Sequence, residues 1–326
     1  MLRIPKDKKF LAGARAIDLC SGLGGFRLAF ESFGGECVFA SDFDESVADV
    51  YEQNFGDRPA GDITKIAEED IPEHDILCAG FPCQPFSISG KQAGFSDTRG
   101  TIFFDIARIA KHHKPKLVFL ENVKNFASHD KKRTLKTVIH VLNDLGYSVH
   151  HKVINASNFG VPQARERIYI LAFREDIDAS EYRFPKIRPA PCVVKDILEP
   201  AEKVADCIVD VVPSFVDNLA EIETKKYIKP IRVGHINLGR QGERIYHVNG
   251  HAITLSAHGG GIGAKTGLYY VDGVVRRLSP RECARLNGFP NRFKLHRRPT
   301  RAYVQLGNSV VVDVLQYLFF SLRGFI

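Results

Sequence analysis

The stretch Asp18 to Gly25, DLCSGLGG, follows the first predicted strand, Ala16 to Cys20, and decides the fold class. Helical apolar spacing begins again at Phe26. Glycines in such a strand-to-helix turn let the backbone approach a ligand closely, at the N-terminus of the next helix. The spacing Gly-x-Gly-Gly differs from the dinucleotide pattern Gly-x-Gly-x-x-Gly, which disfavours hydride transfer. Taken alone, the stretch is compatible with a nucleotide site, a methyltransferase site or a structural turn.

Short apolar strands alternate with helical stretches through the first half of the chain, which predicts an α/β fold with a doubly wound, mostly parallel sheet. A proline-rich segment at 185–191 ends this pattern. The irregular, Gly- and Arg-rich sequence after it predicts a second, smaller, β-rich domain. We therefore predict a first domain at 1–190, a second domain with a hinge at 191–304, and a terminal helix at 305–326 that packs on the first domain. The predicted strands are 16–20, 37–40, 75–79, 116–121, 147–155 and 167–173, and the predicted helices include 26–33, 101–113 and 134–145.

Charge and cysteine content limit the class of protein. The 326 residues carry a net charge of +7, and the segment Lys225 to Arg301 holds sixteen Lys or Arg against three acidic residues. Such a segment fits a polyanion-binding module or a solvated surface, and charge alone does not decide between them. Seven cysteines without a Cys-x-x-Cys pair argue against a zinc ribbon and suggest a reducing cytosol. No stretch is apolar enough to span a membrane.

The segment FPCQPFS, residues 81–87, follows the predicted strand 75–79 and carries Cys83. In α/β proteins the carboxyl ends of the strands form the edge where ligands bind, so Cys83 stands at a candidate active site. Prolines on both sides exclude a helix or strand through this point, and a cysteine in such a loop is a poor candidate for a core thiol. The long polar loop that follows, residues 87–100, suits a lid over a substrate.

Two further segments reach the same edge of the predicted sheet. Glu121 ends one strand, and Arg165 and Arg167 lie at the start of another. Alternate residues of an extended segment point the same way, so both arginines are expected to face one site. Taken singly, each could be a surface charge. With Cys83 they would form a thiol, a carboxyl group and two guanidinium groups at one rim.

Five short motifs together resemble those of the DNA cytosine-5 methyltransferases, in the same order and with the same spacing. The resemblance covers essentially the whole chain and is greatest to the compact bacterial HhaI type, which also shares QGERIY (241–246) before a Gly-Gly-Gly run (259–261). The five motifs are FPCQ (81–84), ENV (121–123), QARER (163–167), RECARLNGFP (281–290) and GNSV (307–310).

This resemblance implies a mechanism based on Cys83. The thiolate would attack C6 of cytosine and raise the electron density at C5, which then accepts a methyl group. Glu121 would hold the N3 and N4 edge of the base and Arg167 its O2, while Arg165 would orient the glutamate or a phosphate. A stacked cytosine is out of reach of these groups, so the base would flip out of the duplex.

The resemblance also implies S-adenosylmethionine as the cofactor, and no metal. The glycine loop, Gly22 to Gly25, would meet its methionine part, Asp42 its ribose, and Phe43 its adenine. Cys20 stands where the family often has an aromatic residue, so one stacking face is thinner. The expected cofactor-binding residues are Cys20, Gly22, Leu23, Gly24, Gly25, Asp42, Phe43, Asp62, Ile63, Pro82, Asn308 and Ser309.

The second domain would then be a target-recognition domain for double-stranded DNA. Gln241 and Arg244 are the candidates for base contacts, because Gln and Arg read purine edges in the major groove. A phosphate clamp is the open alternative for Arg244. Gln84 and Ser89 would fill the space left by the flipped base. His258 stands before the Gly-Gly-Gly run, where the HhaI type has tyrosine, and is a further candidate for DNA contact.

The HhaI-type resemblance suggests GCGC as the target, methylated at the inner cytosine, within a restriction–modification system. We expect a monomer in the bacterial cytoplasm, without membrane contact, whose cognate restriction endonuclease acts separately. The alternatives are a tRNA cytosine-5 methyltransferase of the same fold and an inactive DNA-binding regulator. The regulator would be expected to lack the Pro-Cys or Glu-Asn-Val residues, and both are present. A nicotinamide oxidoreductase is more distant, since it needs no Pro-Cys-Gln loop.

Overall fold

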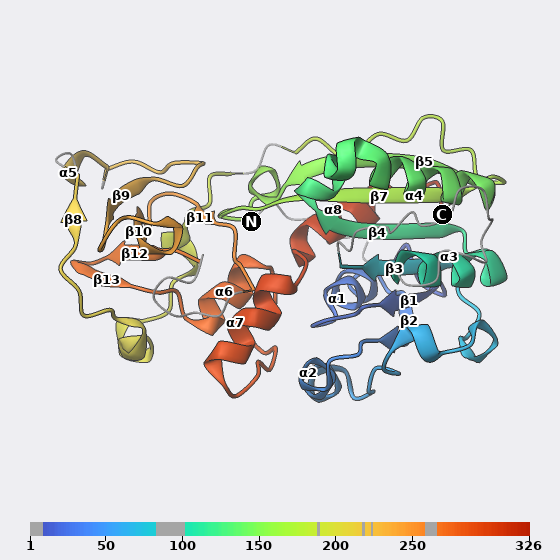
Figure 1. Cartoon of the computed structure of the whole chain (residues 1–326), viewed down its shortest axis with the longest axis horizontal. Coiled ribbons are helices and arrows are strands. Elements are labelled where there is room, and N and C mark those ends of the chain that lie inside the picture. The colour runs from blue at the N-terminus through green and yellow to red at the C-terminus, as the bar shows by residue number, and fades with distance from the viewer. Residues whose placement is uncertain (1–8, 83–101, 188–189, 217–218, 223, 258–265) are drawn as a thin grey trace. The chain divides into compact units, whose positions relative to one another are not determined.

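The computed structural model describes residues 9–82, 102–187, 190–216, 219–222, 224–257 and 266–326. These residues form two compact units, each with its own sheet and its own apolar core (Figure 1). The large unit comprises residues 9–154, 166–185 and 315–326. The small unit comprises residues 155–165 and 186–314.

The large unit is built on a six-stranded sheet in the order β2-β1-β3-β4-β7-β5. β1 pairs in parallel with β2 and β3, and β3 pairs in parallel with β4, whereas β7 runs antiparallel to β4. β2 and β3, which follow β1 in the chain, lie on opposite sides of it in the sheet. In α/β sheets, such a reversal of strand order opens a binding crevice at the carboxyl ends of the strands. The strands are β1 (Arg15–Leu19), β2 (Glu36–Ser41), β3 (Ile76–Gly80), β4 (Leu117–Val123), β5 (Tyr147–Asn155) and β7 (Glu166–Arg174).

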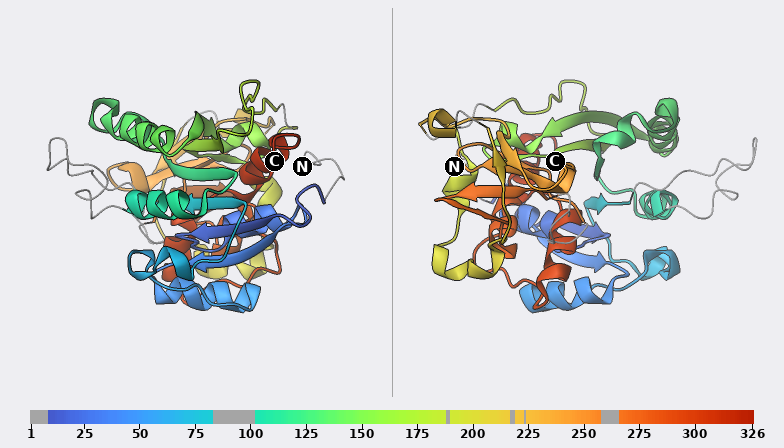
Figure 2. Two further views of the ribbon diagram at one scale, coloured as in Figure 1. Left: turned by 90° about the vertical axis from the view of Figure 1, so that its right-hand side faces the viewer. Right: turned by 60° about the vertical axis from the view of Figure 1, so that its left-hand side comes forward.

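Helices cover both faces of this sheet, with α3 and α4 on one face and α8 on the other (Figure 2). Phe319 of α8 packs against Phe119 of β4 and Phe30 of α1, with ring centroids 5.1 and 5.6 Å apart. The predicted doubly wound, mostly parallel α/β fold is therefore confirmed. The helices are α1 (Gly25–Glu31), α2 (Glu45–Phe55), α3 (Ile102–His113), α4 (Arg133–Asp144) and α8 (Val312–Ser321).

The two central strands explain why the sequence reads as continuous apolar runs rather than as alternation. Residues 76–79 of β3 and 117–120 of β4 are all at most 1% exposed. Both faces of a parallel sheet between helices are dry, so every position along such strands is apolar. The polar residues of these strands are confined to their carboxyl ends, where the sheet meets its ligand edge.

The small unit is built on a five-stranded sheet in the order β13-β12-β10-β9-β8, and a second pair of strands joins β6 to β11. β10 and β12 run parallel, and the other neighbours of the five-stranded sheet run antiparallel. The predicted smaller β-rich region is confirmed. Its elements are β6 (Gln163–Ala164), β8 (Ser214–Phe215), α5 (Leu219–Ile222), β9 (Arg232–His235), β10 (Arg244–His247), β11 (Ala252–Ile253), β12 (Leu268–Val271), β13 (Val274–Arg276), α6 (Pro280–Leu286) and α7 (Pro299–Asn308).

The division of the chain differs from the predicted boundaries at 190 and 304. Residues 155–165 belong to the small unit, because Gln163 and Ala164 of β6 pair with Ala252 and Ile253 of β11. The small unit also begins earlier, after residue 185, and extends to residue 314. These assignments depend on contacts between distant segments, which composition along the chain does not show.

Candidate active site and recognition segment

The turn from β1 into α1 needs small residues at defined positions. Cys20, Gly22 and Gly24 have φ angles of +54°, +52° and +72°, a region that glycine adopts at least cost. A Cβ on Gly24 would lie 2.4 Å from the Phe55 ring, so only glycine fits there. The Gly22 amide donates a 2.8 Å hydrogen bond to the carboxylate of Asp42. The glycine loop is thus tied to the end of β2.

Asp42 is the second fixed point of this edge. Its Oδ2 accepts from Gly22, and its Oδ1 accepts from the amide of Asp44 at 3.0 Å. Burial raises the pKa of the Asp42 carboxyl group, and the two amide hydrogen bonds oppose that shift. The adjacent Phe43 ring is 78% exposed, whereas aromatic rings are usually well buried. A carboxylate beside an open aromatic face suits a nucleoside, because the carboxylate can bind the ribose hydroxyl groups and the aromatic face can stack on the base.

The remaining expected cofactor residues of the large unit differ in what they offer. Asp62 accepts from the amide and the hydroxyl of Thr64, at 3.1 and 2.8 Å, and these bonds lower the pKa of its carboxyl group. Ile63 and Leu23 are buried at 3% and 2% exposure, so their side chains form the wall of the core. Pro82 is exposed two residues after β3 ends at Gly80, at the edge that the parallel strands share.

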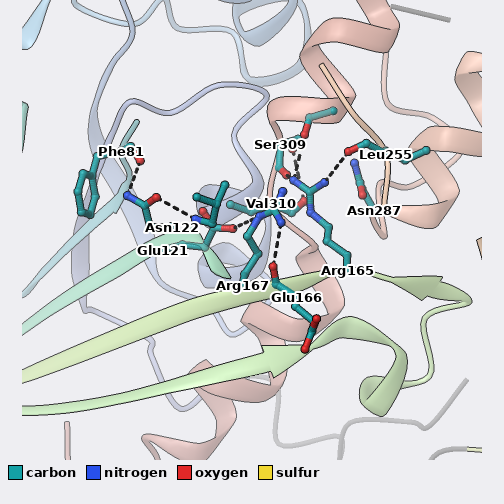
Figure 3. A network of polar contacts seen from close by, with 12 residues as sticks. Phe81, Glu121, Asn122, Arg165, Glu166, Arg167, Leu255, Asn287, Ser309 and Val310 are labelled. Atoms are coloured by element: carbon teal, nitrogen blue, oxygen red, sulfur yellow. Dashed lines mark hydrogen bonds and ion pairs between the residues drawn. The ribbon is translucent and has the colours of Figure 1, made fainter. Parts of the chain in front are cut away.

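Glu121 and Arg167 form an ion pair, with Glu121 Oε1 3.2 Å from Arg167 Nε (Figure 3). The antiparallel register of β4 and β7 places Val123 opposite Arg167 and Glu121 opposite Tyr169, so the paired side chains lie on one face. Their side chains are only 10% and 13% exposed. Because β4 runs parallel to β3, this ion pair lies at the sheet edge from which the segment with Cys83 departs.

Asn122 has a structural role that the sequence did not indicate. Its Nδ2 donates to the carbonyl of Phe81 at 2.9 Å, and its Oδ1 accepts from the Val123 amide at 2.8 Å (Figure 3). The first bond ties the end of β4 to a residue two positions before Cys83. Asn122 therefore fixes the backbone of Phe81 relative to the end of β4. The position of Asn122 between Glu121 and Val123 in the Glu-Asn-Val motif was the feature of the sequence that could have indicated this role.

Asp18 is a second group that sequence reasoning left without a role. It lies within β1 and is 2% exposed. Burial raises the pKa of its carboxyl group well above the usual range, the charge of Asp42 raises it further, and the backbone N–H of Arg27 opposes the shift. A positively charged ligand at this edge would lower that pKa. A carboxyl group between apolar residues of a strand was the sequence signal.

Arg165 has different partners from Arg167, contrary to the expectation that the two face one site. Its guanidinium group donates to the carbonyl oxygens of Leu255, Gly307 and Ser309, at 3.1, 3.0 and 2.5 Å (Figure 3). The side chain is 2% exposed and all three acceptors belong to the small unit. The extended run breaks at Arg165, between β6 and β7, so alternation does not carry across it. Arg165 thus organises the small unit, and a role in orienting Glu121 stays a prediction.

Gln163 works beside Arg165 in the small unit. Its Nε2 donates to the carbonyl of Leu286 at 3.0 Å and to Asn287 Oδ1 at 3.1 Å, and its Oε1 accepts from the Leu255 amide at 3.2 Å. Asn287 in turn donates to the carbonyl of Leu306 at 2.8 Å. Four segments of the chain are therefore joined by the buried amide groups of Gln163 and Asn287, which explains why the QARER and RECARLNGFP motifs carry these polar residues.

The candidate base-reading residues lie where β9 turns into β10. Gln241 begins a single 3-10 turn and is exposed, and Arg244 begins β10 opposite His235 of β9. The turn is closed by the Ile236 amide, which donates to the Glu243 carbonyl at 2.9 Å. Within the described part of the chain, Arg244 Nε has no hydrogen-bond partner. A guanidinium group at the start of β10 is of the type that binds a base edge or a phosphate.

Several predicted site residues are not placed by the structure. Cys83, Gln84, Ser89 and His258 lie outside the described residues. In the small unit, Asn308 ends α7 and is exposed, while Ser309 is 7% exposed. Of the described residues, none belongs to a helix long and apolar enough to cross a membrane, and none joins a group of three or more His, Cys, Asp or Glu that could hold a metal ion.

Comparison with known proteins identifies the family. A family model for the C-5 cytosine-specific DNA methylases matches residues 14–323. This chain belongs to the C-5 cytosine-specific DNA methylase family. It is 55% identical over 317 residues to the Type II methyltransferase M.HhaI of Haemophilus parahaemolyticus, which covers 97% of this chain and 96% of that enzyme. It is 42% identical to M.HpaII of Haemophilus parainfluenzae, over 92% of this chain and 86% of that enzyme.

Solved structures agree on the fold of this DNA methylase. The S. pombe Dnmt2 methyltransferase superposes with a TM-score of 0.70 at 20% identity, over 95% of this chain and 98% of that one. An E. coli prophage DNA modification methyltransferase superposes with a TM-score of 0.70 at 19% identity, over 96% of this chain and 99% of that one. At these identities the likeness shows the methyltransferase fold alone.

Proposed function

We propose that this cytosine-5 DNA methyltransferase acts on a cytosine flipped out of duplex DNA, through a covalent adduct with Cys83. The observation that carries the proposal is the ion pair of Glu121 and Arg167 beside the segment that Asn122 holds. Cytosine presents O2, N3 and N4 in a row along one edge. A carboxyl group at N3 and N4 and a guanidinium group at O2 must therefore be neighbours, and the 3.2 Å pair meets that requirement.

The chemical steps follow from these groups. The Cys83 thiolate forms a bond to C6 of the base, and the electron pair of the C5–C6 double bond moves onto C5. The Glu121 carboxyl group gives a proton to N3 and the Arg167 guanidinium group donates to O2, which stabilises the negative charge that develops there in a site of low exposure. C5 then takes the methyl group, which S-adenosylmethionine supplies when bound. A base removes the C5 proton, the double bond re-forms, and the carbon–sulfur bond breaks to release Cys83.

Residues at the carboxyl edge of the large unit support S-adenosylmethionine as the cofactor. The exposed ring of Phe43 would take the adenine and the carboxylate of Asp42 the ribose hydroxyl groups. Asp18 and Asp42 place two carboxyl groups close enough for one to raise the pKa of the other. A ligand that carries a sulfonium and an ammonium group would relieve that repulsion. The glycine loop would let the backbone approach the methionine part.

We further propose that the enzyme is a monomer and that it methylates the inner cytosine of GCGC as part of a restriction–modification system. The likeness to M.HhaI across both units supports this, because the small unit would carry the specificity. Bisulfite sequencing of DNA from cells that express the protein tests it, with a strain that lacks the gene as control. Protected cytosines confined to GCGC are expected. Protection at another sequence would overturn the specificity, and transfer to tRNA but not to duplex DNA would overturn the function.

A further inference from the structure

The recognition turn, residues 236–244, presents an apolar side chain to solvent. Leu238 is 79% exposed, although the segment around it carries three arginines, Arg232, Arg240 and Arg244. Its neighbours Asn237 and Gly239 have φ angles of +45° and +68°. Two left-handed residues around Leu238 turn the chain outward there, since this conformation reverses the backbone direction locally.

The backbone of the recognition turn is fixed, so the exposure of Leu238 is built into the fold. The Gly239 amide donates to the Ile236 carbonyl at 3.0 Å, and the Arg240 amide donates to Glu243 Oε2 at 2.8 Å. Ile236 is 1% exposed and anchors the turn in the core of the small unit. Leu238 is thus held at the surface of a well-ordered turn.

Space around Gly239 reinforces this arrangement. A Cβ on Gly239 would lie 2.5 Å from His235 Cδ2 and 3.2 Å from Arg232 Nη2. The side chains of Arg232 and His235 therefore cover the turn directly beside Leu238.

Charge indicates what covers Leu238 when the enzyme works. Arg232, Arg240 and Arg244 surround it in sequence, and Glu243, the acidic residue of the turn, is bonded to the Arg240 amide. A positive surface of this kind fits the phosphates of duplex DNA. Among the base edges of the major groove, the apolar group is the C5-methyl of a pyrimidine.

We propose that Leu238 is a specificity-determining residue that contacts a pyrimidine C5-methyl group in the major groove. This inference rests on the proposed function of the small unit in DNA recognition. The methyl group has two sources: 5-methylcytosine in the complementary strand of the site, or thymine in the flanking sequence. GCGC contains no thymine, so within that site the methyl group is the one that the enzyme itself adds to the other strand.

Equilibrium binding of four duplexes distinguishes the two sources. The duplexes carry cytosine or 5-methylcytosine in the complementary strand, each with thymine or uracil in the flanks. We expect wild type to bind about three- to fourfold more tightly when one of these methyl groups is present, the gain from burying one such group. Leu238→Ala should lose the gain and Leu238→Met should retain it. If wild type loses the gain in affinity when uracil replaces thymine in the flanks, Leu238 contacts the methyl group of a flanking thymine. If it loses the gain when cytosine replaces 5-methylcytosine, Leu238 contacts the methyl group in the complementary strand.

Ile228→Ala is the matched control, because Ile228 is 72% exposed in the same unit, outside the turn. It should bind all four duplexes as wild type does. Equal affinity of wild type for all four duplexes, or the same methyl gain in Leu238→Ala, would overturn the proposal. Methyl transfer by wild type is measured separately on the same duplexes, so a failure of the proposed function would show as absent transfer rather than as absent methyl preference.

Discussion

The carboxyl edge of the large sheet and the recognition turn of the small unit use side chains in opposite ways. At the sheet edge, the polar side chains are largely buried and have protein partners. Glu121 forms an ion pair with Arg167, and Asn122 and Asp42 form hydrogen bonds to backbone groups. In the recognition turn, backbone hydrogen bonds fix the chain, while Leu238 and Gln241 stand exposed. The difference indicates that the first region is preorganised for chemistry and the second for contact with a large polar surface. Substitutions in the first should change the rate, and those in the second should change binding.

The largest expected effect within this comparison comes from Glu121→Gln. The amide keeps the shape but has no proton to give to N3 as the adduct forms, so methyl transfer should fall about 10²- to 10⁴-fold, with DNA binding retained. Steady-state transfer of labelled methyl groups and gel-shift binding measure the two quantities. Glu166→Gln is the control, since the Glu166 side chain forms an exposed ion pair with Lys124 and its loss should leave transfer unchanged. A Glu121→Gln enzyme with full activity would remove the sheet edge from the chemistry.

A smaller effect, on binding, is expected at Arg244. If it contacts a guanine, Arg244→Ala should cost about 1–3 kcal/mol on the cognate site and relax preference at one base. A phosphate clamp would weaken every duplex alike and lower the salt slope by about one. Arg297→Ala and Arg298→Ala should show that second pattern. Binding to cognate and single-mismatch duplexes at several salt concentrations decides the matter, and uniform loss for Arg244→Ala would refute its base-reading role.

Asp18 gives a prediction about pH and stability. Its pKa is raised in the folded protein, so the stability it contributes is present below the unfolded pKa, about 3.9, and is lost as pH rises through the folded pKa. Without cofactor, Asp18→Asn should therefore be more stable than wild type above the unfolded pKa, and its advantage should grow as the pH rises toward the folded pKa of Asp18. Urea unfolding measures this. Asp62→Asn, at a carboxyl group with a lowered pKa, should show no such gain with rising pH.

The smallest effect is expected at Cys20. Cys20→Phe would add an aromatic face for the adenine and tighten S-adenosylmethionine binding by roughly 0.5–1.5 kcal/mol. Cys20 has a φ of +54°, and the strain that this left-handed conformation imposes on a bulky side chain keeps the expected gain small. Isothermal titration calorimetry on wild type and variant gives the difference. Weaker binding would mean that the site has closed around the smaller side chain.

The sequence predicted those features of the fold that local apolar patterns encode. The strand at 147–155 has the predicted bounds, and the other predicted strands of the large sheet differ by one or two residues. The antiparallel direction of β7 was not predicted, because a buried apolar run looks the same in either direction. The assignment of residues 155–165 to the small unit also escaped prediction, since it depends on pairing with a segment about ninety positions away.

The candidate site shows the same limit. Motif residues such as Glu121 and Arg167 were expected together and lie 3.2 Å apart. Arg165 was expected beside them, yet its donors are taken by carbonyl groups of the small unit. Spacing indicates where a side chain can point but not which acceptors surround it. The burial of Asp18 and the bond from Asn122 to Phe81 likewise depend on tertiary contacts that no local pattern encodes.

The proposed covalent bond between Cys83 and the target base is tested most directly by a trapping experiment. Wild type is incubated with S-adenosylmethionine and a duplex that carries 5-fluorocytosine at the target position, then run on a denaturing gel. We predict a stable protein–DNA complex, because fluorine cannot leave C5 as a proton does. Cys83→Ala should form none, whereas Cys192→Ala should form it as wild type does. A complex with Cys83→Ala, or none with a wild-type enzyme that methylates ordinary cytosine, would contradict the account.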